Sequence, residues 1–167
     1  MRTAYGKNKG LNVKTLSDRI IRFFQNQGFV IVSTIDSHGR PHNSCKGIIK
    51  ITKTGQVYLL DLYKERTFRN LKRNPYIAIT AIDEHRFKGF CLKGKAEIIR
   101  GSEISPRLIA AWEERITQRI TQRLLKNLRG EKGHPRHPEI LLPKPKYMIV
   151  MEIKEVVDLT PHHIKRK

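Results

Sequence analysis

The chain has 167 residues, of which 38% are hydrophobic, and this length suits one domain better than two. Its composition excludes a wholly disordered chain, and the absence of any apolar run near ~20 residues excludes a membrane-spanning helix. Lysine and arginine number 34 against 15 acidic residues, which gives a formal charge of +19. This excess favours an anionic partner such as nucleic acid, a membrane surface or a phosphorylated ligand, although a basic solvated surface accounts equally well for charges spread along the whole chain.

The N-terminal segment and the cysteines indicate the compartment. Residues 1–14 are basic, contain glycine and lack the apolar core of a signal peptide, so we expect a basic arm and a cytoplasmic protein. Cys45 and Cys91 form no CxxC pair. We therefore expect two buried thiols and no disulfide, as is usual in a reducing compartment.

A first helix and a series of strands follow the arm. Helical spacing of apolar residues after Thr15 or Ser17 predicts a helix that ends at Gly28. Phe29–Ile35 is almost entirely apolar or β-branched, which predicts a strand buried on both faces. Tight turns follow at Gly39 and at residues 53–55, so the strands they join should be antiparallel. Four further strands are predicted, over residues 41–52, 56–62, 76–82 and 86–99.

Two more helices are predicted. Residues 64–74 have helical spacing and end before Pro75, which disfavours continuation. Ser105 and Pro106 begin the longest predicted helix, Pro106–Leu128. One face of that helix is apolar, and another carries Arg115, Arg119 and Arg123 one turn apart. A last strand is predicted over residues 147–157, and an antiparallel barrel with helices at its ends would leave few exposed edges.

The standard catalytic motifs GxGxxG, GxxxxGK[ST], HExxH and GxSxG do not occur. His134 and His137 have no second ligand pair at suitable spacing, so we expect no metal site. His42 and Cys45 should point to opposite faces of their strand, which argues against a nucleophile–base pair.

The start of the short helix is a candidate phosphate site. A helix N-terminus offers unpaired backbone N–H groups and the positive end of the helix dipole. Lys64, Arg66 and Thr67 lie at that end, although an exposed amphipathic helix would have the same composition. On the second strand, Ser44 and Lys46 should share one face.

Three motifs in order carry a family resemblance: T-x-D-x-x-G-x-P at residues 34–41, N-L-x-x-N-P at residues 70–75 and G-K-A-E at residues 94–97. Over about residues 15–100 and 147–159 the sequence resembles the FMN-binding split-barrel family related to pyridoxamine 5′-phosphate oxidase. The resemblance implies a mainly β, α+β fold: a six-stranded antiparallel Greek-key split β-barrel with flanking helices. It would form a single domain over residues 15–160, with a helix-rich insertion at 102–146 and a basic tail at 161–167.

The resemblance also implies an oxidoreductase that binds FMN between the subunits of a homodimer. Its phosphate site maps onto Lys64, Arg66 and Thr67, and its flavin-ring site onto Asn43, Ser44, Cys45, Lys46, Leu60 and Asp61. Lys46 is the candidate positive group beside the ring. Catalytic residues remain unassigned, and the C-terminal substrate-binding segment of true pyridoxamine-phosphate oxidases is missing, which leaves the small substrate open.

Two alternatives remain at this point. The chain could be a non-catalytic basic module that binds nucleic acid or another polyanion, although it lacks the usual recognition motifs. The same fold could also hold a deazaflavin or a haem in place of FMN.

Overall fold

The computed structural model describes residues 15–131 and 141–165, so the expected N-terminal arm and the His134–His137 pair lie outside the described residues. The helices are α1 (Asp18–Gln25), α2 (Arg66–Arg73), α3 (Pro106–Leu128) and α4 (His162–Lys165), and a 3-10 turn, η1 (Gly101–Glu103), precedes α3. The strands are β1 (Val30–Ile35), β2 (Pro41–Lys46), β3 (Ile48–Ile51), β4 (Gln56–Asp61), β5 (Tyr76–Asp83), β6 (Lys88–Arg100) and β7 (Tyr147–Asp158).

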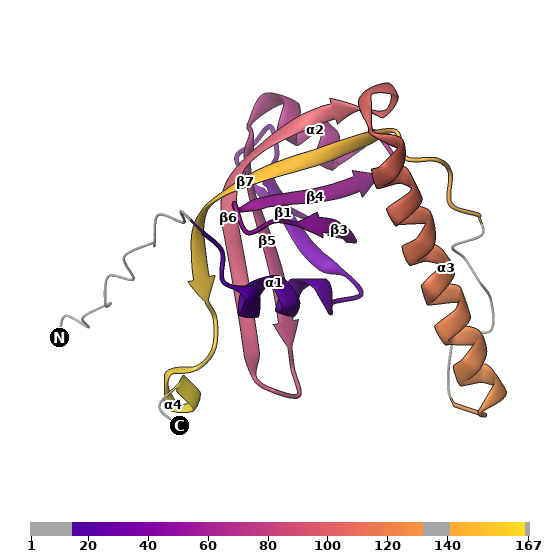
Figure 1. Ribbon diagram of the computed structural model, residues 1–167. Coiled ribbons are helices and arrows are strands. Elements are labelled where there is room, and N and C mark those ends of the chain that lie inside the picture. Colours follow the sequence, from indigo (N-terminus) through magenta and orange to yellow (C-terminus); the bar gives the residue numbers. More distant parts are fainter. Residues whose placement is uncertain (1–14, 132–140, 166–167) are drawn as a thin grey trace.

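In the described part of the chain the strands form one antiparallel sheet in the order β2-β1-β5-β6-β7-β4-β3, curled into a half-barrel (Figure 1). The predicted mainly β barrel with flanking helices is confirmed. Seven strands are present instead of six, because Gly47 divides the predicted strand over residues 41–52. β2 pairs with β1 at one edge of the sheet, whereas β3 pairs with β4 at the other.

The interior of the half-barrel is the main core. Ile21 and Phe24 of α1 and Leu71 of α2 pack against the inward-facing side chains of the strands. Ser17, one of the two predicted caps, accepts a hydrogen bond from the Ile20 amide at 3.4 Å and begins α1.

The outer face of the sheet corrects two predictions. β1 alternates buried and more exposed positions, and Ile31 is 41% exposed, so the prediction of a strand buried on both faces is wrong. Cys45, Ile31, Thr80 and Cys91 are consecutive partners across four strands and therefore share this outer face. Both cysteines are free thiols, but Cys45 is exposed and Cys91 half-buried, so the expectation of two buried thiols is also wrong.

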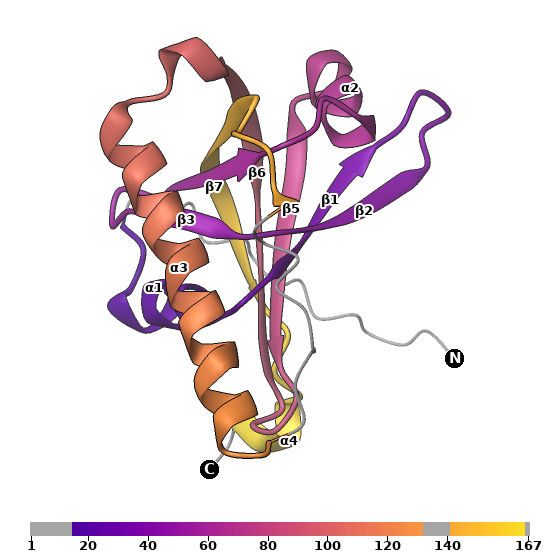
Figure 2. The ribbon, with the colours of Figure 1, turned by 90° about the vertical axis from the view of Figure 1, so that its right-hand side faces the viewer.

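The long helix α3 lies along one side of the sheet (Figures 1 and 2). Its first half packs through Leu108 and Trp112 on a second apolar cluster that includes Leu60 and Met148. Its last turns do not continue that contact, since Leu128 is 83% exposed. The predicted apolar face is therefore used only in part. No helix within the described ranges is both long and apolar enough to cross a membrane.

Candidate functional site

Strand β2 and the first turn of α2 are joined by two hydroxyl groups. Ser44 and Lys46 face the inside of the sheet and are half-buried, whereas Cys45 is exposed, which confirms the predicted alternation. Ser44 Oγ lies 3.1 Å from Thr67 Oγ1, and the Thr67 side chain is buried. Two hydroxyls from segments 23 positions apart thus lie side by side at the start of a helix.

The N-terminus of α2 opens onto a hollow of about 190 Å³. Glu65 occupies the N-cap position without a side-chain capping hydrogen bond, and the first turn contains no acidic residue. The first backbone N–H groups are therefore not capped by a side chain and remain suited to an anion. The hollow is lined by His42, Ser44, Lys46, Asp61, Tyr63, Glu65, Arg66 and Thr67.

A buried polar network closes one side of this hollow. Lys46 Nζ forms an ion pair with Asp61 Oδ2, and the same oxygen accepts a hydrogen bond from the Tyr147 hydroxyl at 2.5 Å. The side chains of Lys46 and Asp61 are only 10% and 11% exposed. Because β2 and β4 are not neighbours in the sheet, the ion pair joins two strands that no ladder connects. Burial, reinforced by the Asp61 carboxylate, raises the pKa of Tyr147 far above its ordinary value, so the phenol remains a donor.

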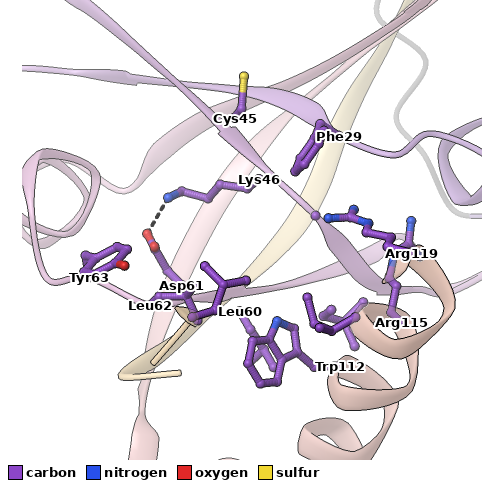
Figure 3. A pocket seen from close by; sticks show the side chains of 14 residues that line it. Phe29, Cys45, Lys46, Leu60, Asp61, Leu62, Tyr63, Trp112, Arg115 and Arg119 are labelled. Atoms are coloured by element: carbon purple, nitrogen blue, oxygen red, sulfur yellow. Dashed lines mark hydrogen bonds and ion pairs between the residues drawn. The ribbon is translucent and has the colours of Figure 1, made fainter. Parts of the chain in front are cut away.

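A second hollow, of about 290 Å³, lies between this network and α3 (Figure 3). It shares Lys46, Asp61 and Tyr63 with the first hollow, so the two are adjoining parts of one groove. Most of its other walls are apolar, and they include the side chains of Phe29, Ile49, Leu60, Leu62, Trp112, Ile116 and Leu142.

Two arginines of α3 form the far wall of the second hollow. Arg115 Nη2 donates to the carbonyl oxygens of Gln27 at 2.9 Å and Gln25 at 3.4 Å. Arg119 donates to the Gly28 carbonyl, and its guanidinium carbon lies 4.4 Å from the centre of the Phe29 ring. Both side chains anchor α3 to the connection between α1 and β1. Burial lowers the pKa of Arg115 from its ordinary value.

The structure brings most of the predicted site residues together. Five of them, Ser44, Lys46, Asp61, Arg66 and Thr67, line the first hollow. Cys45 and Leu60 line the second hollow with Lys46 and Asp61, and in Figure 3 the Cys45 sulfur is directed away from the Lys46–Asp61 pair.

Two predicted residues lie elsewhere. Asn43 is exposed and lines neither part of the groove, because its strand position faces the outer side of the sheet. Lys64 lines a different hollow, beside α2, and its Nζ lies 5.6 Å from the centre of the Phe68 ring. The predicted grouping of Lys64 with Arg66 and Thr67 is therefore not seen in this hollow.

Sequence reasoning missed the groove residues that come from distant segments. Tyr147 is the first residue of β7, and Trp112, Arg115 and Arg119 lie on α3. Trp112 is the single tryptophan of the chain, and from the sequence it belongs only to the apolar face predicted for this helix. No local pattern distinguishes a helix residue that packs on the core from one that lines a hollow at its edge.

Comparisons with known proteins agree with the fold. A family model described as pyridoxamine 5′-phosphate oxidase matches residues 16–155. No curated protein matches the sequence.

Among solved structures, the chain is similar to a conserved hypothetical protein of Mycobacterium tuberculosis, with 18% identity, coverage of 95% of this chain and 93% of that one, and a TM-score of 0.60. A pyridoxamine 5′-phosphate oxidase-related, FMN-binding protein of Nostoc punctiforme gives 16% identity, coverage of 84% and 76%, and a TM-score of 0.52. An F420 reductase gives 15% identity, coverage of 81% of this chain and 94% of that one, and a TM-score of 0.50. These likenesses show a shared fold, and the family match spans α1 to most of β7, so the chain belongs to the pyridoxamine 5′-phosphate oxidase family.

Proposed function

We propose that the protein is an FMN-binding oxidoreductase that acts on a small substrate. The observation that carries the proposal is the two-part groove, in which a polar hollow at a helix N-terminus adjoins an apolar hollow. FMN has the matching chemistry, since it carries a phosphate at one end and a flat, largely apolar ring system at the other. Membership of the family and the similarity to a protein named as FMN-binding support the same choice.

The residues of the first hollow fit a phosphate group. Arg66 would supply a guanidinium, and Ser44 and Thr67 would supply hydroxyl donors. The uncapped N–H groups at the start of α2 would be further donors to the phosphate. Glu65 is an exposed carboxylate on the rim and opposes the anion, but water screens its charge.

The buried network would position the ring. Tyr147 and Asp61 hold the Lys46 ammonium at the junction of the two hollows, where it lies beside any ligand that spans the groove. Asp61 compensates much of that charge, so the junction is less positive than Lys46 alone would make it. When bound, the flavin supplies electron transfer, while these residues bind and orient it.

We further propose that the protein acts as a homodimer with FMN at the subunit interface. The outer face of β1 and β5 supports this arrangement, because Ile31, Tyr76 and Ile82 are 41%, 58% and 59% exposed there. Exposed apolar side chains on one face of a sheet are typical of an association surface. Sedimentation of the purified protein tests this part: a monomer at micromolar concentration, with FMN bound, would contradict it.

The cofactor is tested by the absorption spectrum of the purified protein and by mass spectrometry of what denaturation releases. Flavin bands with FMN in the released fraction support the proposal. A Soret band would indicate that the cofactor is haem. Release of a deazaflavin would indicate that the cofactor is that deazaflavin and not FMN. A colourless protein that takes up no added FMN, and whose retention on nucleic acid falls steeply with salt, would indicate a binding module.

A further inference from the structure

A third hollow, of about 650 Å³, lies beside α2 and shares no lining residue with the two hollows of the proposed cofactor groove. Its lining includes four basic residues: Lys64 just before α2, Lys72 on α2, Arg100 at the end of β6 and Lys146 just before β7. The remaining lining is Phe68, Ile98, Gly101, Ser102, Pro145 and Tyr147. Three segments far apart in the sequence thus bring positive charge to one concavity.

Lys64 and Lys72 both lie close to one aromatic ring, that of Phe68. Phe68 and Lys72 lie one turn apart on α2, and Lys64 lies in the connection just before the helix. The Nζ atoms of Lys64 and Lys72 lie 5.6 Å and 5.7 Å from the centre of the Phe68 ring. That ring packs edge-on against Tyr147, with 4.9 Å between centroids. Both ammonium groups therefore lie near an aromatic ring that lines the hollow.

Within the described part of the chain, no ion pair compensates the positive charge of this hollow. No aspartate or glutamate lines it, and within residues 15–131 and 141–165 no ion pair joins any of its four cations to a carboxylate. Glu103 is close in the chain, and its carboxylate accepts a hydrogen bond from the Arg100 backbone N–H at 3.4 Å. Four like charges around one concavity repel one another, and an anion of matching charge relieves that repulsion.

We propose that this hollow binds a compact oligophosphate, meaning two or three linked phosphate groups. Four cations exceed the charge of a single phosphate, which favours a ligand with several negative charges. An extended nucleic acid strand fits less well, since the cations surround a concavity and Phe68 already carries two ammonium groups, leaving its ring poorly placed for base stacking. The linked phosphates could belong to free oligophosphate or to the tail of a nucleotide.

The experiment is calorimetric titration of the full-length protein with inorganic tripolyphosphate at about 0.15 M salt, where long-range attraction is screened. Replacing Lys72 and Lys146 by glutamine should weaken binding about tenfold, since two direct charge-assisted contacts are lost. The matched control removes two exposed charges outside the hollow, by Arg69→Gln and Lys95→Gln, and should change affinity less than about threefold. Arg66→Ala with Thr67→Ala should retain tripolyphosphate binding, which separates this hollow from the proposed cofactor site.

Further titrations distinguish the possible ligands, and three results are decisive. Adenosine triphosphate that binds as tightly as tripolyphosphate indicates recognition of the phosphate chain alone, and tighter binding indicates a nucleotide. Equal loss of affinity in the Lys72/Lys146 pair and in the control pair would overturn the proposal. It would also be overturned if the Lys72/Lys146 pair weakened binding of single-stranded RNA and left tripolyphosphate unaffected. The FMN content of the protein does not depend on any of these outcomes. If the oligophosphate proposal is wrong, the proposed FMN-binding function is therefore unaffected.

Discussion

Tyr147 donates its phenolic hydrogen to Asp61 Oδ2 at 2.5 Å and so joins the first residue of β7 to the last residue of β4. The two residues are also direct partners in the antiparallel ladder. Asp61 is held on its other side by Lys46. The position of the Lys46 ammonium in the groove therefore depends on a tyrosine 86 positions from the carboxylate that it contacts.

Tyr147→Phe should lower the free energy of unfolding by about 1.5 kcal/mol at pH 8, because the variant loses a hydrogen bond to an ionised carboxylate. The raised pKa of Tyr147 predicts how this difference changes with pH. Below pH ~10 the phenol is protonated in both folded and unfolded protein and adds no pH dependence. Above pH ~10 only the unfolded chain releases this proton, so stability falls as pH rises, by up to about 1.4 kcal/mol per pH unit.

Urea unfolding at pH 8 and pH 11 measures both effects. The difference in the free energy of unfolding between the parent protein and Tyr147→Phe should shrink at pH 11. The parent loses stability there because its unfolded chain releases the Tyr147 proton, whereas the variant has no such proton to release. Tyr76→Phe is the control, because Tyr76 is 58% exposed and its removal should change little at either pH. A deficit that stayed constant between the two pH values would show that the Tyr147 proton is not retained in the folded protein.

Local patterns in the sequence predicted the elements well, because each element has its own signal. The bounds of α3 are those predicted from Ser105 and Pro106, and Ser17 caps α1 as one of two candidates. The break at Gly47 was missed, since a glycine between two apolar runs does not reveal that the chain crosses from one sheet edge to the other.

The sequence predicted only those residues of the candidate site that lie in short, continuous stretches of the chain. Ser44 follows the first of the three family motifs and Arg66 and Thr67 precede the second, and the structure places all three residues around one hollow. The second hollow depends on how α3 packs, which is decided by contacts such as Arg115 with the Gln27 carbonyl. Such contacts link residues 88 positions apart, and a single sequence contains no periodicity that pairs them.

Replacing Arg66 and Thr67 by alanine should weaken FMN binding about 100-fold, since a charge-assisted contact and a hydroxyl contact to the phosphate are both lost. Trp112 offers the measurement, because it is the single tryptophan and lines the adjoining hollow, so a bound flavin should quench its fluorescence. FMN is titrated into cofactor-free protein and into the variant. Arg69→Ala is the control on the same helix, since Arg69 does not line the groove. An unchanged midpoint in the double variant would contradict the phosphate assignment.

Gly94→Ala should destabilise the fold by about 3 kcal/mol, a cost typical of an atom forced into a packed interior. Gly94 lies at the bulge where the register between β6 and β7 shifts, as expected for a glycine inside a strand. A Cβ atom there would lie 1.9 Å from the Glu152 carbonyl oxygen, which is backbone and has little room to move. Gly28→Ala is the matched control, because no atom lies within 4 Å of the Cβ it would add. Chemical denaturation compares the two, and equal midpoints would show that the β6–β7 bulge accommodates a side chain.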